Sequence, residues 1–377
     1  MTDGYRVCSR CVSDTTIPAI RFDARGECNF CKVHDDLDRL YPLDGRGEAQ
    51  RDRLLARIRR AGRGRAHDCV VGMSGGTDST YTLYLARQLG LKPLGVHLDN
   101  TWNTEVAEAN MQKAADALDV PLRRVECDWP EFRALQRAFL EASVPEMEIP
   151  TDVAIHAVLH DVAAEEGIRY VLNGHSFRTE GIAPIGWTYM DGRYIRSVYR
   201  QFAGGRLRHF PNLTISRYLY YTMVKRVKGI PFLNYFEYSK TGAREVLQEK
   251  LGWTYYGGHH FESTYTRFII AYVLQEKFGI DKRKINFSAH VRSGLMTRRD
   301  ALQRLQEPLT VPDGMVEHVL DRLGLGEAEF EAIMRATPKC FHDYPTYYPM
   351  LRALRPLLKV ASKVGLVHPV LYMKFFG

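Results

Sequence analysis

One short stretch of the sequence has residue types suited to binding phosphate. Residues 69–80 read CVVGMSGGTDST, which is an apolar run, a glycine turn and the start of an amphipathic pattern. Gly75 and Gly76 allow the backbone to approach an anion closely, and the first amides of a following helix would point at it. The hydroxyl groups of Ser74 and Ser79 add donors. The stretch predicts a phosphate-binding loop between a strand and a helix, without the lysine of a Walker loop.

Four of the seven cysteines form a second chemical motif. Cys8 and Cys11 make one C-x-x-C pair, and Cys28 and Cys31 make another. Each pair turns two thiolates toward one point, so the four together predict a tetrahedral Zn²⁺ site of the zinc-ribbon type. All four positions are cysteine, which favours a structural metal over a catalytic one. Two unrelated redox pairs are the weaker alternative.

The residues after the loop alternate between helix and strand patterns. Repeated βα units predict an α/β fold with a doubly wound parallel sheet, whose ligands bind at the carboxyl ends of the strands. The expected strands after the loop are 94–98, 122–127 and 169–172, and the expected helices are 77–90, 104–118, 131–142 and 152–166. The strand ends are then 74–78, 99–103, 128 and 173–180.

Composition divides the chain into four expected regions. These are a zinc-ribbon knuckle at 1–40, a basic helical linker at 41–66, the loop domain at 67–205 and a mostly helical substrate or partner region at 206–377. In the last region tyrosines at helical spacing favour a packed core over stacking of nucleic-acid bases. His156 and His160 have H-x-x-x-H spacing, which we interpret as a polar helix face rather than a metal site.

Charge and hydropathy narrow the function only partly. The formal net charge of +8 over 377 residues suits an RNA-binding protein, and equally an enzyme that handles ATP and an acidic sugar. The sequence has no apolar run of about eighteen residues, and its N-terminus has no apolar targeting region. We therefore expect a cytoplasmic protein without a membrane span.

The motifs resemble a known family in several places at once. SGGTDS at 74–79 resembles the SGGxDS signature of the PP-loop ATP pyrophosphatases, which makes 67–205 the expected ATP-binding domain. Over roughly residues 5–335 the chain is similar to the N-acetyl sugar amidotransferases, a PP-loop family linked to bacterial lipopolysaccharide and sialic-acid-like sugars. The motifs that carry this similarity are the cysteine pairs and residues 74–79, 99–105, 143–146, 149–152, 179–181, 257–267 and 278–284.

The resemblance implies a reaction as well as a PP-loop fold. It implies that ATP adenylates the acetamido oxygen of an N-acetylated, nucleotide-linked or acidic sugar and releases pyrophosphate, with Mg²⁺ and Zn²⁺ as further cofactors. Ammonia then displaces AMP and leaves an acetamidino sugar. The sequence has no recognisable glutaminase region, so the resemblance also implies a separate HisH-like glutaminase subunit and a HisF-like subunit that conducts ammonia.

The expected site combines motif residues with residues at strand ends. Adenine and ribose are expected along Met73, His97 and Asp99, because parallel neighbouring strands place these at one edge of the sheet. The expected catalytic residues are Ser74, Asp78, His260, Glu262 and Arg267. The expected nucleotide-binding residues are Met73, Ser74, Gly75, Gly76, Thr77, Asp78, Ser79, His97, Asp99, Gly174 and His175. The expected substrate-binding residues are Trp102, Asn103, Asp152, Glu180, Lys282 and Arg283, and the metal ligands are Cys8, Cys11, Cys28 and Cys31.

Some positions depart from the family pattern or have simpler explanations. His259 stands where the family has lysine, so Arg267, Lys282 and Arg283 are the candidate cations for pyrophosphate. Residues 173–176, Asn-Gly-His-Ser, replace the more typical Ser-Gly-Asn-Asn and resemble the glycine-histidine turn of other PP-loop enzymes. The simpler explanation for Glu262 and Arg267 is a surface ion pair.

Two other functions fit part of the sequence. A tRNA-thiolating PP-loop enzyme would explain the cysteine motif, the positive charge and adenylation together. Its sulfur chemistry normally uses paired or clustered cysteines in the catalytic domain, whereas Cys69, Cys127 and Cys340 stand alone. A nucleotide sensor without enzymatic activity is the weakest of the three interpretations.

Overall fold

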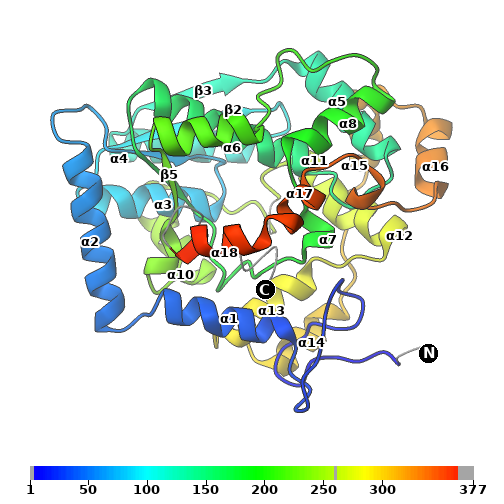
Figure 1. The fold of residues 1–377 in the computed structure, drawn as a ribbon, viewed down its shortest axis with the longest axis horizontal. Helices are drawn as coiled ribbons and strands as arrows, with labels where there is room; N and C mark the ends of the chain where they lie inside the picture. The colour runs from blue at the N-terminus through cyan, green and yellow to red at the C-terminus, as the bar shows by residue number, and fades with distance from the viewer. Residues whose placement is uncertain (1–3, 259–260, 364–377) are drawn as a thin grey trace.

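A five-stranded parallel sheet organises the fold (Figure 1). The computed structural model describes residues 4–258 and 261–363. The strands lie in the order β3-β2-β1-β4-β5, and each neighbouring pair is parallel. Their bounds are β1 Cys69–Gly72, β2 Pro93–Asp99, β3 Leu122–Glu126, β4 Tyr170–Asn173 and β5 Lys228–Pro231. The predicted α/β fold with a doubly wound parallel sheet is confirmed.

The strand that precedes the glycine turn is the centre of this sheet. In β1, Val71 pairs with Gly95 of β2 on one side and with Leu172 of β4 on the other. After β1 the chain adds β2 and β3 on one side of the sheet, and then returns to add β4 and β5 on the other side of β1. The order in which strands are added therefore reverses between β1 and β4. Open α/β sheets bind ligands at such a switch point, outside the carboxyl ends of the strands.

Strand β5 lies in the region 206–377, which the sequence predicts to be mostly helical. Its four residues are Lys-Gly-Ile-Pro, and glycine and proline are depleted in strands. Proline is tolerated here because β5 is an edge strand, where a missing amide need not break a ladder. The region expected to be mostly helical therefore supplies the last strand of the sheet.

The two faces of the sheet are covered by different helices. Side chains alternate along a strand, so Val70 packs into one hydrophobic cluster and Val71 into another. Helix α6 covers the Val70 face, while α3, α4 and α10 pack together over the Val71 face. Their bounds are α3 Thr77–Gln88, α4 Glu105–Leu118, α6 Ile149–Glu165 and α10 Lys240–Leu251.

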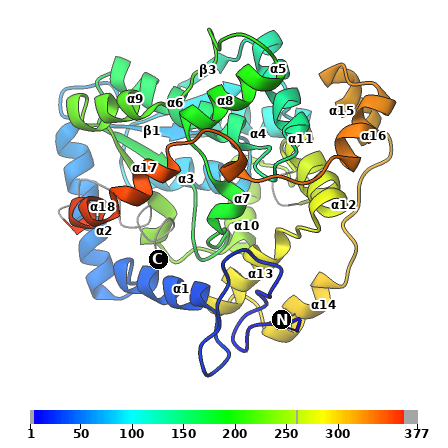
Figure 2. The same ribbon diagram turned by 45° about the vertical axis from the view of Figure 1, so that its right-hand side comes forward.

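The N-terminal segment packs against helices from the other end of the chain (Figure 2). It contains the four cysteines, α1 Asn29–Leu40 and α2 Gly45–Ala61, and α2 is the predicted linker helix. The cysteine-containing part and α1 lie against α13 Arg283–Arg292 and α14 Arg298–Leu305. Lys284 forms an ion pair with Asp14, with Nζ 2.6 Å from Oδ2.

The remaining elements are short and almost all helical, which confirms the helical C-terminal region. The α-helices are α5 Trp129–Glu141, α7 Ile185–Thr188, α8 Gly192–Phe202, α9 Ile215–Leu219, α11 Thr264–Phe268, α12 Leu274–Phe278, α15 Met315–Leu323, α16 Glu327–Arg335, α17 Tyr348–Ala353 and α18 Arg355–Lys363. Two π-helical turns are η1 Tyr220–Val224 and η3 Ile269–Val273, and two 3₁₀ turns are η2 Phe232–Tyr235 and η4 Phe341–Asp343.

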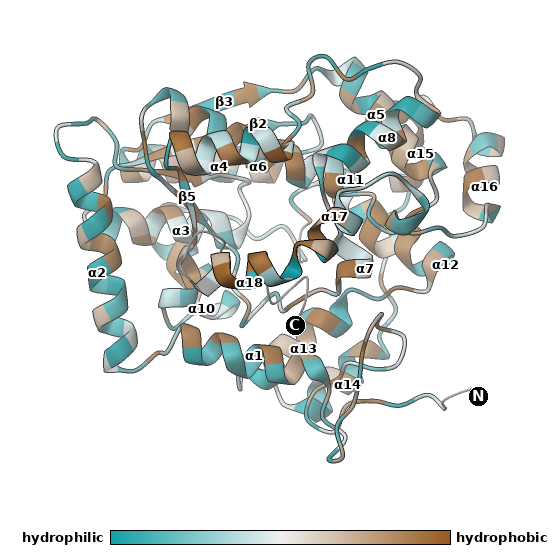
Figure 3. Cartoon of the chain, in the orientation of Figure 1, coloured by the Kyte–Doolittle hydropathy of each residue, from teal (hydrophilic) through white to brown (hydrophobic). Residues whose placement is uncertain are grey.

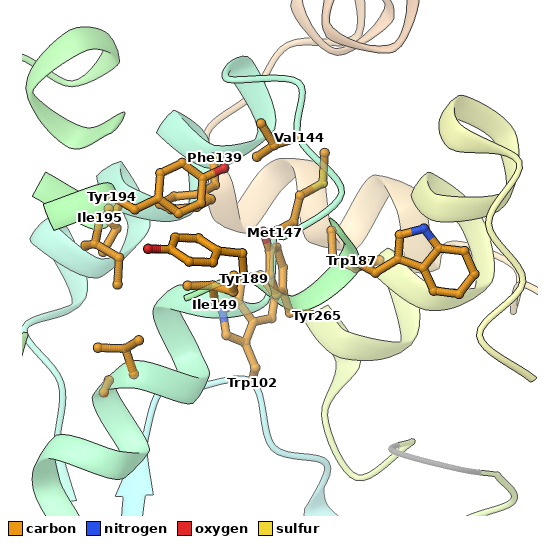
Figure 4. Packing of buried hydrophobic residues seen from close by; sticks show 14 of the residues in the cluster. Trp102, Phe139, Val144, Met147, Ile149, Trp187, Tyr189, Tyr194, Ile195 and Tyr265 are labelled. Carbon is orange, nitrogen blue, oxygen red and sulfur yellow. The ribbon is translucent and has the colours of Figure 1, made fainter. Parts of the chain in front are cut away.

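Aromatic side chains fill much of the core between these helices (Figure 4). The rings of Trp102 and Tyr265 lie 5.3 Å apart between centroids, although the two residues come from distant parts of the sequence. Beyond residue 205, Tyr221 and Tyr238 are buried, as the core interpretation predicts, whereas Tyr220 is exposed.

The helices mix hydrophilic and hydrophobic residues along their lengths (Figure 3). In α2, for example, Leu54, Leu55 and Ile58 are buried while the neighbouring arginines are largely exposed. Among the described residues, no helix has both the length and the apolar character needed to cross a membrane.

One buried carboxyl group stands out in the turn between α5 and α6. Glu146 is only 1 % exposed. Burial is the main influence on this group, and it raises the pKa of Glu146 to about 8 because a charged carboxylate is poorly solvated there. The folded protein therefore holds Glu146 as a neutral acid at neutral pH.

This burial predicts a pH-dependent stability. Between about pH 4.3 and the folded pKa near 8, the unfolded chain ionises Glu146 and the folded chain does not, so stability should fall as the pH rises. The limiting slope is about 1.4 kcal/mol per pH unit. The Glu146→Gln variant should lose this slope in urea unfolding measured from pH 5 to 8. Parallel stability curves for the two proteins would contradict the prediction.

Candidate active site

The glycine turn lies at the carboxyl end of β1 and leads directly into α3. Gly75 has a φ of +73°, and a Cβ added to it would lie 2.2 Å from the carbonyl oxygen of Ala107, so only glycine fits. The hydroxyls of Ser74 and Ser79 are 3.1 Å apart, and the Ser79 hydroxyl accepts the amide of Ser74 at 3.2 Å. These contacts hold the loop open in front of the first amides of α3, as the sequence predicts for a phosphate site.

A pocket of about 170 Å³ opens in front of this loop. Most of its lining residues are polar or charged, and they come from four separate parts of the chain. The lining residues are Ser74, Gly76, Thr77, Asp78, Ser79, Gly174, Glu180, Lys240, Arg244, Tyr256, Gly258 and Glu262. The pocket thus joins the two strand ends at the switch point with α10 and with the segment that precedes α11.

A partly buried ionic network lines this pocket. Lys240 Nζ lies 2.9 Å from Asp78 Oδ2 and 3.6 Å from a carboxylate oxygen of Glu180. The hydroxyl of Tyr238 donates to the other oxygen of Asp78. Burial raises the pKa of Asp78, and Lys240 opposes that effect. Burial also disfavours the charged form of Lys240, but the attraction of Asp78 and Glu180 raises its pKa on balance, so Lys240 remains a cation.

Sequence reasoning missed four residues of this pocket region: Tyr238, Lys240, Arg244 and Tyr256. Two cationic side chains line the pocket, Lys240 and, one helical turn further along α10, Arg244. The guanidinium of Arg244 lies 4.1 Å from the ring centroid of Tyr255. If β5 had been predicted, Lys240 would have become a candidate, because residues that follow a parallel strand are expected near the edge of the sheet where ligands bind.

Glu262 reaches the pocket through a short antiparallel contact with the segment after β2. The amide of Thr104 donates to the carbonyl oxygen of Glu262 at 2.9 Å, and the amide of Thr264 donates to that of Trp102 at 2.9 Å. A Cβ placed on Gly76 would lie 2.9 Å from Glu262 Oε1, so the carboxylate sits beside the loop. The structure thus brings together the expected residues Ser74, Asp78 and Glu262.

Gly174 also lines this pocket, whereas several other expected residues lie around it. A Cβ on Gly174 would lie 2.8 Å from the carbonyl oxygen of Asp78. His175 donates to Glu180. Arg267 lines a second pocket with Phe261, whose ring centroid is 4.1 Å from the guanidinium. His259 and His260 lie outside the described residues.

Met73 and His97 are buried beneath the loop. His97 Nδ1 donates to the carbonyl oxygen of Met73 at 2.7 Å, and Asn103 Nδ2 donates to His97 Nε2 at 2.7 Å. Burial lowers the pKa of His97, so the ring is neutral and this pair of hydrogen bonds fixes its tautomer. Asp99 accepts the amide of Thr101 at 2.8 Å. Adenine and ribose binding along these residues stays a prediction.

The expected substrate residues are dispersed. Trp102 is buried, and its indole donates to Gln136 at 3.0 Å. Asp152 lies in the first turn of α6, and Lys282 immediately precedes α13. Arg283 forms an ion pair with Asp281 at 2.8 Å and donates to the carbonyl oxygen of Glu307 at 2.6 Å, which ties α13 to the segment after α14.

The four N-terminal cysteines converge on one point. Their sulfur atoms all lie within 4.8 Å of one another, and all four residues are buried. The Cys8–Cys31, Cys11–Cys28 and Cys28–Cys31 sulfur distances are 3.8, 3.7 and 3.6 Å. A tetrahedron with metal–sulfur bonds of about 2.3 Å has edges of about 3.8 Å, so this spacing fits a single tetrahedral metal ion.

Arg292 of α13 supports the cysteine cluster from outside. Its guanidinium donates to Cys11 Sγ at 3.0 Å, to Cys31 Sγ at 3.3 Å and to Cys28 Sγ at 3.4 Å. Four thiolates around a divalent cation carry net negative charge, which a buried guanidinium offsets. The cysteine cluster is therefore built jointly by the N-terminal segment and the C-terminal helices.

Comparison with known proteins supports the resemblance seen in the sequence. Residues 262–355 match the family model described as "LPS biosynthesis protein WbpG-like, C-terminal domain". This match supports the resemblance to the N-acetyl sugar amidotransferase family in that part of the chain. No curated protein matches the sequence.

Several solved structures align over most of the chain at low similarity. NMN synthetase from Francisella tularensis is 13% identical to this chain, with a TM-score of 0.30. The alignment covers 78% of this chain and 99% of the synthetase chain. The NH3-dependent NAD synthetase from Campylobacter jejuni is 12% identical, with a TM-score of 0.30, and the alignment covers 78% of this chain and 98% of the synthetase chain. U34-tRNA thiolase NcsA from Methanococcus maripaludis, with its [4Fe-4S] cluster, is 14% identical, with coverages of 85% and 98% and a TM-score of 0.31.

The sulfur geometry predicts one metal ion per chain. Purified protein should contain zinc, and Cys28→Ser should lose it together with local stability on the order of 10 kcal/mol, because metal binding and folding are coupled. Cys127→Ser is the matched control, since Cys127 lies outside the cluster. Elemental analysis measures the content. Unchanged metal in Cys28→Ser, or iron with visible absorbance in the wild type, would contradict a structural zinc site.

Proposed function

We propose that this protein is an ATP-dependent N-acetyl sugar amidotransferase of lipopolysaccharide biosynthesis. It would adenylate the acetamido oxygen of an N-acetylated sugar and replace that oxygen with ammonia to give an acetamidino sugar. The observation that carries the proposal is the position of Glu262. This residue is the first of the segment matched by the WbpG-like family model, and its carboxylate lies beside the phosphate-binding loop.

The chemistry of an acetamido group explains why ATP would be used. Amide resonance, reflected in a C–N rotation barrier of about 18 to 20 kcal/mol, makes the carbon a poor electrophile and the oxygen a poor leaving group. In the first step the amide oxygen bonds to the α-phosphorus of ATP, and the bond to the bridging β-phosphate oxygen breaks. Pyrophosphate leaves with that electron pair. In the second step ammonia adds to the activated carbon, loses protons to solvent and expels AMP.

The residues of the loop pocket suit the first step. The amides at the start of α3 and the hydroxyls of Ser74 and Ser79 would orient the phosphates. Lys240 and Arg244 place two cationic side chains in the same pocket, where they would stabilise the negative charge that builds on pyrophosphate. The proposed contribution of the protein is thus positioning and charge stabilisation, without a covalent intermediate.

The donor atoms of the pocket also fit Mg²⁺. Asp78, Glu180 and Glu262 place three carboxylates in the lining, and carboxylate and phosphate oxygens are the ligands that Mg²⁺ prefers. Asp78 and Glu262 would hold the ion beside the loop, and the bound ion would neutralise phosphate charge. The four cysteines would hold a structural Zn²⁺.

Ammonia would come from a separate protein. Burial raises the pKa of Cys69, of Cys127 to about 11, and of Cys340, so each thiol outside the metal cluster is protonated at neutral pH. A glutaminase nucleophile needs the opposite shift. We therefore propose a HisH-like glutaminase partner with a HisF-like subunit that conducts ammonia, and a cytoplasmic reaction.

The tRNA-thiolation alternative receives no specific support from the pocket. Its lining, as far as the chain is described, includes no cysteine that could carry sulfur. An RNA-dependent rather than sugar-dependent formation of AMP would revive it.

The proposal predicts a large effect from the pocket lysine. Lys240→Met should lower sugar- and ammonia-dependent AMP formation by about tenfold to a hundredfold, the loss expected when a charge-assisted contact worth about 1.5 to 3 kcal/mol is removed. Mass spectrometry should detect replacement of oxygen by NH in the product of the wild-type enzyme.

Lys250→Met is the matched control, because Lys250 lies on the same helix with its side chain exposed and paired with Glu249. It should retain wild-type activity. Thermal unfolding of both variants separates lost chemistry from lost folding, since Lys240→Met also leaves two partly buried carboxylates without their cation. Wild-type AMP formation in a folded Lys240→Met protein would contradict the proposed role.

A further inference from the structure

A second pocket borders the same segment that carries Glu262. Its volume is about 220 Å³. The residues that give it chemical character are Thr104, Phe261, Thr264, Arg267, Asp313 and His318. Thr104 follows β2 and is hydrogen-bonded to the backbone of Glu262, so one short backbone segment borders both pockets. A ligand here would lie next to the phosphate-binding loop without occupying it.

Arg267 is the distinctive side chain of this pocket. Its guanidinium stacks 4.1 Å from the ring centroid of Phe261, which holds it in place. Its Nε is buried and has no hydrogen-bond partner among the described residues. Buried polar groups are normally hydrogen-bonded, so the guanidinium keeps hydrogen-bonding capacity that the described residues do not use.

The walls combine features that suit a sugar with an anionic group. Arginine binds carboxylate and phosphate in a bidentate manner. Asp313, Thr264 and Thr104 offer acceptors and donors for hydroxyl groups, and the Phe261 ring offers an apolar surface. Most of this lining lies within residues 262–355, the segment matched by the family model, whereas the phosphate-binding loop lies outside that segment.

We propose that this second pocket binds the acceptor sugar of the reaction through an anionic group, either a phosphate or a carboxylate, held by Arg267. The inference rests on the proposed function and assigns that function its acceptor site. In this arrangement ATP occupies the loop pocket, the sugar occupies the second pocket, and the segment around Glu262 lies between them. Arg267 therefore selects the acceptor instead of binding pyrophosphate.

Calorimetric titration of the full chain with four probes tests this assignment. The probes are neutral N-acetylglucosamine, N-acetylglucosamine 1-phosphate, UDP-N-acetylglucosamine and N-acetylneuraminic acid. The wild type should bind at least one anionic probe about tenfold or more tightly than the neutral sugar, and which probe it prefers distinguishes phosphate from carboxylate. Arg267→Gln should abolish this preference, and Arg267→Lys should restore part of it. Binding of a non-hydrolysable ATP analogue should be unchanged in both variants.

Arg335→Gln is the matched control, because Arg335 lies in the same C-terminal region but is exposed and paired with Glu331. It should bind every probe as the wild type does. An anionic preference that survives in Arg267→Gln would overturn the acceptor assignment while leaving the proposed function intact. Equal affinity of the wild type for neutral and anionic sugars would overturn it as well. Binding of the ATP analogue without binding of any sugar would count against both the assignment and the proposed function.

Discussion

The partly buried ion pair between Asp78 and Lys240 is the interaction on which the site depends. Asp78 follows β1 and Lys240 follows β5, and Glu180, which follows β4, joins them from a third strand end. Removing these charges from water is costly, and their mutual attraction and the Tyr238 hydroxyl offset that cost only in this geometry. The network therefore ties together three segments, which follow β1, β4 and β5, and each of them lines the pocket.

Close backbone contacts provide the second constraint on the site. Gly75 lies against the carbonyl oxygen of Ala107, and Gly174 lies against that of Asp78, so no larger residue fits at either position. The hydrogen bonds between residues 102–104 and 262–264 then bring a segment from the second half of the chain to the same edge of the sheet. Close packing against the two glycines therefore fixes the shape of the loop. The ion pair and the backbone hydrogen bonds determine which segments lie around it.

The sequence revealed features whose spacing reflects local structure, and concealed those that depend on distant contacts. The glycine loop, the four cysteines and strands β2 to β4 follow from short-range patterns. Lys240 could not be found in this way, because it is positioned by β5, a four-residue edge strand with a glycine and a proline. The separation of Glu262 from Arg267 into two pockets was likewise hidden, since it depends on how residues 261–264 pack against the segment after β2.

The contact between Arg292 and the cysteine cluster bears on how the chain folds. The four cysteines share one hydrophobic cluster with the sheet and with residues as distant as Tyr344, so the ribbon has no separate core. Without the cysteine sulfurs, the guanidinium of Arg292, only 9 % exposed as a residue, would lose its main acceptors. We therefore expect the ribbon and the α/β body to unfold as one cooperative unit. A fragment that begins after residue 40 would expose the inner face of α13 to water, or α13 would separate from the fold.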